Sequence, residues 1–140
     1  PTRIKTFFSL LPLWAGIEIP EEEARAAIEQ HLLNPKEFWG DIPFPSTAYD
    51  EPAYDPMGYW RGRTWPHVYF WNVEILAKYG YEAEAMQAKD RFLAMISQGR
   101  EIPENFPTRW SKLGHPGMPH YTFGTGTLVH FLLDWHLQPL

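Results

Sequence analysis

The residues best suited to chemistry begin with an aromatic and cationic run near the middle of the chain. Its aromatic members are Tyr59, Trp60 and Trp65, and Arg61 lies between them. Indole rings offer flat apolar faces, and a guanidinium offers a rigid fork of donors. A sugar ring has C–H groups on its faces and hydroxyls at its rim, so this run could bind carbohydrate. The alternative is that the aromatics are core and the arginine stacks on them at the surface.

A single carboxylate, Glu104, is the second candidate. It lies in a loop with few other charges, between Pro103 and the sequence Asn105-Phe106-Pro107. Hydrolysis of a glycosidic bond requires two carboxyl groups, one to protonate the leaving oxygen and one to activate water or attack the sugar. Less supported candidates for the same role are Asp50, Asp55 and Glu101. The alternative for Glu104 is a structural loop acid that caps a helix or pairs with an arginine.

Other classes of chemistry find no support in the sequence. There is no cysteine and no Gly-x-Ser-x-Gly segment for a nucleophile. His115 and His120 share one loop without further ligands, and no Gly-rich phosphate cradle is present, so we expect no metal and no cofactor. The formal net charge of −5 argues against nucleic acid or an anionic membrane as partner. No apolar run is long enough to span a membrane. Because no signal peptide is visible and there is no cysteine, we expect the cytoplasm.

The element that must position the aromatic run is a helix starting at Pro66. Proline suits the first turn of a helix, where N–H groups have no intrahelical partner. One face then carries residues at three- and four-residue steps, namely Val68, Tyr69, Asn72, Ile75, Leu76 and Tyr79. Gly80 is the expected stop. A second amphipathic helix over 82–97 follows at once, so the pair is expected to form an antiparallel hairpin.

The remaining sequence predicts further helices separated by long loops. Residues 7–16 are apolar almost all round, 20–32 are amphipathic, and a last helix is expected over 124–137. The Pro-rich segment 38–58 is expected to be an ordered loop at the rim of a pocket, and 101–120 is a second long loop. No strand pattern is evident. This all-α layout of helical hairpins is typical of toroids of paired helices, and the chain has too few helices to close one alone.

Several motifs together resemble a known family. Four motifs follow one another along the chain: Leu11-Pro12-Leu13-Trp14-Ala15-Gly16, then Phe44-Pro45-Ser46, then Tyr59-Trp60-Arg61-Gly62 with Trp65-Pro66, and last Glu104-Asn105-Phe106. Their order is similar to the C-terminal part of glycoside hydrolase family 63, whose clan has (α/α)6 barrels. Two positions depart from the family pattern: Arg63 stands where proline is frequent, and Phe106 stands where tyrosine is usual.

The resemblance implies a part of an inverting α-glycosidase acting on α-glucosides or related sugars. It places Glu104 as the general base, and it places the substrate-binding residues at Tyr59, Trp60, Arg61, Gly62, Trp65 and Ser46. The general acid is expected upstream of this chain. Residues 1–140 would then be the C-terminal portion of one catalytic domain, inactive alone and partnered by the remaining N-terminal part of the same barrel. The alternative is a non-catalytic carbohydrate-binding or helical scaffold domain.

Overall fold

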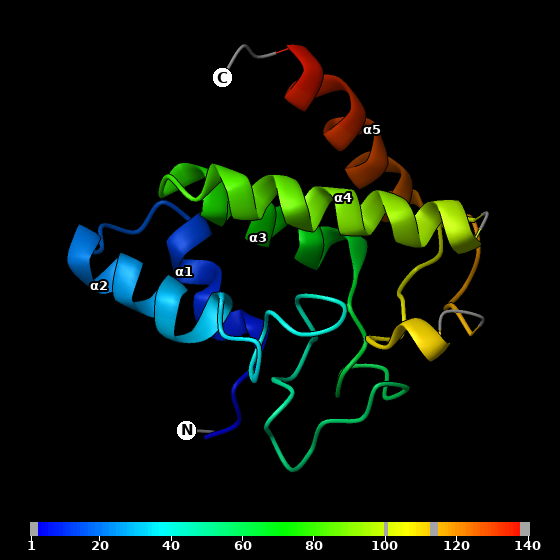
Figure 1. Ribbon diagram of the computed structural model, residues 1–140, viewed down its shortest axis with the longest axis horizontal. Coiled ribbons are helices and arrows are strands. Elements are labelled where there is room, and N and C mark those ends of the chain that lie inside the picture. Colours follow the sequence, from blue (N-terminus) through cyan, green and yellow to red (C-terminus); the bar gives the residue numbers. More distant parts are fainter. Residues whose placement is uncertain (1–2, 100, 113–114, 138–140) are drawn as a thin grey trace.

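The structure is a computed structural model that describes residues 3–99, 101–112 and 115–137, with the side chains of the last helix as far as Leu133. The α-helices are α1 (Leu11–Trp14), α2 (Glu21–Ala27), α3 (Pro66–Lys78), α4 (Glu82–Gly99) and α5 (Thr122–Leu137) (Figure 1). Short 3₁₀ turns occupy Phe7–Leu10 and Trp110–Lys112, and a π-helical turn at Ile28–Leu32 extends α2. Within the described ranges there is no strand, only two isolated antiparallel bridges, so the all-α prediction is confirmed.

Helix α3 is the centre of the fold, packed against α1, α4 and α5. It begins where expected because Trp65 is extended and Pro66 takes the first helical position. The predicted face is buried, including Val68, Tyr69 and Leu76. Gly80 follows the helix with a φ of 82°, a left-handed conformation that glycine adopts without strain. The chain then reverses into α4, which runs alongside α3 in Figure 1, so the predicted hairpin is confirmed.

Phe92 on α4 lies at the junction of the core. Its ring centroid is 5.2 Å from that of Tyr69 on α3 and 5.4 Å from that of Phe131 on α5. The ring of Phe106, in the loop after α4, is 6.1 Å away. All four side chains are buried. One aromatic cluster therefore holds three helices and the loop that carries Glu104.

The apolar segment at the start of the chain is covered on one side only. Phe7, Leu10 and Leu13 are buried, in keeping with the expected burial of this stretch. Phe8 is 56% exposed and Trp14 is 42% exposed, so the described residues leave the other side of this stretch uncovered. Exposed apolar side chains also occur on α5, at Phe123, Val129, Leu132 and Leu133.

The Pro-rich segment 38–58 is ordered but serves mainly as core. Ile42, Phe44 and Ala48 are fully buried, and the Phe44 ring lies edge-on to Tyr69 at 5.0 Å. The first half of the segment therefore packs on the core, and its predicted place at a pocket rim stays a prediction. The second half, near Asp55, does reach the aromatic run, because the Asp55 N–H donates to the Arg61 carbonyl at 3.0 Å.

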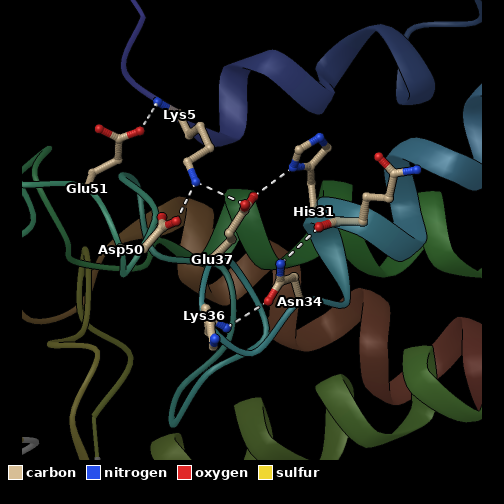
Figure 2. A network of polar contacts seen from close by, with 8 residues as sticks. Lys5, His31, Asn34, Lys36, Glu37, Asp50 and Glu51 are labelled. Atoms are coloured by element: carbon tan, nitrogen blue, oxygen red, sulfur yellow. Dashed lines mark hydrogen bonds and ion pairs between the residues drawn. The ribbon is translucent and has the colours of Figure 1, made fainter.

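A polar network ties the N-terminal segment to this loop (Figure 2). The Lys5 ammonium contacts Asp50 and lies 2.9 Å from one carboxylate oxygen of Glu37, while His31 Nδ1 lies 2.7 Å from the other oxygen. The Lys5 backbone N–H donates to Glu51 at 3.0 Å. Glu37 is buried, so its partners compensate for lost hydration. The network fixes the segment that precedes α1 against the loop behind the aromatic run.

Candidate functional site

An isolated bridge brings the two predicted stretches together. Thr64 and Phe106 exchange both backbone N–H···O=C bonds, each of 2.9 Å, in antiparallel pairing. Thr64 lies between Arg63 and Trp65, and Phe106 directly follows Asn105. The α3–α4 hairpin connects the two partners of the bridge. The aromatic run and Glu104 therefore share one site although they are far apart in the sequence.

The aromatic run forms a layered cluster with one open face. The rings of Trp60 and Trp65 stack in parallel, with centroids 3.9 Å apart and planes inclined by 8°. Tyr59 meets Trp65 edge-on at 4.7 Å. Tyr59 is 53% exposed and Trp60 42% exposed, whereas Trp65 is 2% exposed. Trp60 and Tyr59 thus present the accessible surface, and Trp65 supports it from below.

Glu104 lies against this surface. The Tyr59 hydroxyl donates to Glu104 Oε1 at 2.7 Å, and the Asn105 side-chain N–H donates to Oε2 at 3.2 Å. The backbone N–H of Glu104 donates to the Met118 carbonyl at 2.7 Å, which fixes the loop. The hydrogen bond to the Glu104 carboxylate raises the pKa of Tyr59, because ionising the phenol would remove the donated proton. The site therefore holds a carboxylate, a phenol and an indole side by side.

Titration of Tyr59 tests this contact directly. Glu104→Gln removes the negative charge that favours the protonated phenol, so the pKa of Tyr59 should fall toward its ordinary value. The measurement is the pH dependence of the Tyr59 ring-carbon resonance in NMR spectra of the two proteins. The hydrogen bond to Glu104 is the largest cause of the raised pKa, so an unchanged titration would contradict that contact.

Arg61 pairs with Asp55, not with Glu104. Its Nη2 atom is 3.1 Å from Asp55 Oδ2, and both side chains are substantially exposed. An ion pair of this kind contributes little to stability. Its effect is to hold the guanidinium at the border of the aromatic surface, where a ligand could displace the carboxylate. The predicted contact of Arg61 with substrate stays a prediction.

Gly62 is buried under the turn that carries Asp55. A Cβ atom at this position would meet the Asp55 carbonyl oxygen at 2.1 Å and the Asp55 carbonyl carbon at 2.6 Å. These are backbone atoms, which cannot rotate away as a side chain could. Gly62 therefore serves the close approach of two backbone segments, and its predicted contact with substrate stays untested.

Replacement of this glycine should be costly. Gly62→Ala forces the two backbone segments apart and should lower the free energy of unfolding by roughly 1–3 kcal/mol, the usual cost of overpacking. Urea denaturation followed by circular dichroism measures the change. Gly126→Ala is the matched control, because a Cβ there has no atom within 4 Å. Equal stability of the two variants would contradict the close approach.

Ser46 lies behind the aromatic run. Its backbone N–H donates to the Arg63 carbonyl at 3.0 Å, and the next residue, Thr47, donates its hydroxyl to the Trp60 carbonyl at 3.2 Å. The Ser46 hydroxyl is buried without a hydrogen-bond partner in the described part of the chain. These contacts support the backbone of the run, while a contact of Ser46 with sugar stays a prediction.

Arg63 is a site residue that sequence reasoning noted only as a departure from the family pattern. Its guanidinium donates to the carbonyls of Met57 (3.2 Å) and His115 (3.0 Å) and to Asn105 Oδ1 (3.0 Å). It is buried, and the loss of hydration lowers its pKa, although nearby Asp55 acts in the opposite direction. In the sequence, the one sign that Arg63 is special is that it stands where the family frequently has proline. Arg63 joins the loop that contains Met57 to two points of the loop that carries Glu104.

An apolar groove between α3 and α5 adjoins the site. The cavity has a volume of about 530 Å³ and is lined mainly by aromatic and small side chains, including Phe70, Trp71 and Phe123. His67 links it to the aromatic cluster, with ring centroids 5.7 Å from Trp65 and 5.8 Å from Phe123. Burial lowers the pKa of His67, so its neutral form is favoured. The site therefore opens onto an apolar surface along α5.

Two further findings bear on what the site can bind. In the described ranges, no three histidine, aspartate or glutamate side chains are arranged to hold a metal ion. No helix among the described residues is long and apolar enough to cross a membrane.

Comparison with known proteins identifies relatives of this arrangement. A family model described as the mannosylglycerate hydrolase MGH1-like glycoside hydrolase domain matches residues 1–111. This chain is similar to two crystal structures of the glycoside hydrolase family 63 mannosylglycerate hydrolase from Thermus thermophilus. The complex with glucose has a TM-score of 0.76 and 26% sequence identity, and the complex with Tris and D-glycerate has a TM-score of 0.74 and 26% identity. Each covers 94% of this chain. An uncharacterized conserved protein from the same organism covers 96% at 25% identity, with a TM-score of 0.73. The chain spans 31–32% of these structures.

Proposed function

Because this chain belongs to the mannosylglycerate hydrolase MGH1-like glycoside hydrolase family, we propose that it is part of an inverting α-glycosidase with Glu104 as general base. Its fold is the expected one, helical hairpins that form part of an (α/α)6 toroid. The single observation that carries the proposal is the position of the Glu104 carboxylate, 2.7 Å from the hydroxyl of Tyr59, whose ring lies 6.0 Å from that of the exposed Trp60. A sugar stacked on Trp60 would place its ring next to this carboxylate.

The arrangement suits a base more than an acid. Glu104 accepts hydrogen bonds at both of its oxygens, so the two donors hold the carboxyl group in one orientation, and a general base must be positioned in this way to take a proton from water. In an inverting glycosidase the general acid lies on the other side of the sugar, roughly 6.5–9.5 Å from the base, so that a water molecule fits between sugar and base. We assign that acid to sequence outside this chain, since the chain spans only 32% of its structural relative.

The apolar surface supports a missing part of the barrel as partner. Phe123 is 62% exposed, and it lies with Val129, Leu132 and Leu133 on a helix that α3 covers on one side. Exposed apolar patches of this kind mark interaction surfaces. The remaining N-terminal helices of the toroid would cover α5 and the groove beside it.

The substrate we propose is a small α-hexoside. A related structure contains glucose, and another contains D-glycerate, in a mannosylglycerate hydrolase. In this chain, the stacked indoles suit the apolar face of one hexose, and Arg61 suits a carboxylate or hydroxyls at its rim. An α-linked glucosyl or mannosyl glycerate combines these features.

Product stereochemistry tests the reaction. The complete barrel, which includes this chain, should release the β-anomer from an α-mannosyl or α-glucosyl glycerate, as seen by proton NMR within the first minutes. The 140-residue chain alone should release none. Release of the α-anomer would contradict the inverting mechanism, and hydrolysis by the isolated chain would contradict an external general acid.

A carbohydrate-binding or scaffold role is the alternative, because the exposed Trp60 and Tyr59 would serve binding without hydrolysis. Calorimetric titration with the same glycosides separates the two. Binding by the complete barrel without any hydrolysis would favour the alternative.

A further inference from the structure

Arg63 carries its charge in an unusual setting. It is 9% exposed, and its three acceptors are neutral oxygens, two of them backbone carbonyls. No carboxylate in the described part of the chain forms an ion pair with it. Burying a guanidinium costs free energy that neutral acceptors offset only partly. A neutral side chain of similar length could fill the same space, so the charge needs a further explanation.

The third acceptor, the Asn105 amide, connects Arg63 to Glu104. Its Oδ1 accepts from Arg63 Nη1 at 3.0 Å, and its Nδ2 donates to Glu104 Oε2 at 3.2 Å. A guanidinium only donates and an ionised carboxylate only accepts, so the amide has one orientation that satisfies both neighbours. Rotating it by half a turn would place the amide oxygen against the carboxylate and the NH₂ group against the guanidinium.

The surrounding chain leaves the amide no freedom. Asn105 is fully buried, and its backbone carbonyl accepts from the Gly117 N–H at 2.9 Å. A Cβ atom on Gly117 would lie 2.8 Å from the Asn105 side-chain atoms, so the glycine backbone packs directly on the amide. A chain of buried cation, buried amide and half-buried carboxylate also polarises each of its hydrogen bonds.

We propose that Arg63 is the positioning residue for Glu104: it fixes the Asn105 amide so that its NH₂ group holds Glu104 Oε2 while Tyr59 holds Oε1. The carboxylate is then held at both oxygens and has one orientation toward the sugar site. This inference rests on the proposed role of Glu104 in catalysis, but the contact itself exists independently of turnover.

Side-chain amide NMR tests the proposal without an activity assay. In Arg63→Met, which keeps length and packing but loses charge and donors, the Asn105 NH₂ resonances should shift. Their solvent exchange should accelerate on the order of tenfold, the equivalent of one hydrogen bond to a charged group. Glu104→Gln should shift the same resonances. Arg25→Met, which removes an exposed arginine on α2, should change neither shift nor exchange.

Unchanged Asn105 resonances and exchange in a folded Arg63→Met protein would overturn the proposal. Far-UV circular dichroism establishes that the variant folds. If it does not fold, Arg63→Lys is judged by the same two criteria, because lysine keeps the charge but lacks the fork. Since neither criterion needs hydrolysis, this result is independent of whether Glu104→Gln abolishes activity.

Discussion

Glu104→Gln in the complete barrel should lower the rate of glycoside hydrolysis by about 10²–10⁴, the usual contribution of a general base. The amide keeps the shape of the side chain and can still accept from the Tyr59 hydroxyl, but it cannot take a proton from water. Ground-state sugar binding should therefore change little. The measurement is kcat with an α-mannosyl or α-glucosyl glycerate, together with the dissociation constant from calorimetry.

The matched control is Glu101→Gln. Glu101 lies in the same loop and is exposed, so loss of its charge should leave the rate within about twofold, as for an ordinary surface substitution, and a larger loss would favour Glu101 as the catalytic carboxylate. Near wild-type activity of the Glu104 variant would remove it as the base. Asp55, which is paired with Arg61, would then be the next carboxylate to replace.

Phe92→Ala should lower the free energy of unfolding by about 3–5 kcal/mol, the range for deleting a buried phenylalanine. Its ring contacts Tyr69, Phe106 and Phe131, so the cavity would lie where α3, α4, α5 and the Glu104 loop meet. A loss of this size is a large part of the stability of an ordinary domain. Chemical denaturation monitored by tryptophan fluorescence measures it.

Phe123→Ala is the control for this effect. The same side chain is removed from α5, but Phe123 is 62% exposed, so the change in the free energy of unfolding of this chain should stay within about 0.5 kcal/mol. A loss in Phe92→Ala no greater than in Phe123→Ala would contradict the central place of Phe92 in the core.

The helices followed from the sequence because their signals are local. Each signal of helix α3 lies within a few residues of the feature that it predicts. These signals are Pro66 at the helix start, the spacing of Tyr69 and Leu76 on the buried face, and Gly80 after the last turn. The last helix was expected at residue 124 and begins at Thr122, a difference within the ordinary uncertainty of helix ends.

The loops could be predicted only in part, since their contacts join distant residues. Aromatic content argued that segment 38–58 is ordered, but nothing local showed that Phe44 enters the core against Tyr69. Within the site, Tyr59, Trp60 and Glu104 were named and do lie together. Trp65 is buried beneath Trp60, and Arg63 contacts Asn105. Both arrangements depend on the Thr64–Phe106 bridge, which no periodic pattern in the sequence predicts.

The bridge between Thr64 and Phe106 also sets the order in which the site can assemble. Arg63 and Asn105 are 42 residues apart, so joining them in an open chain carries a large loss of conformational entropy. The intervening hairpin of α3 and α4 removes most of that loss by bringing its own two ends together. Contacts between near neighbours form first. We therefore expect the contact between Arg63 and Asn105 to form after the helical hairpin, although the hairpin carries none of the predicted substrate contacts.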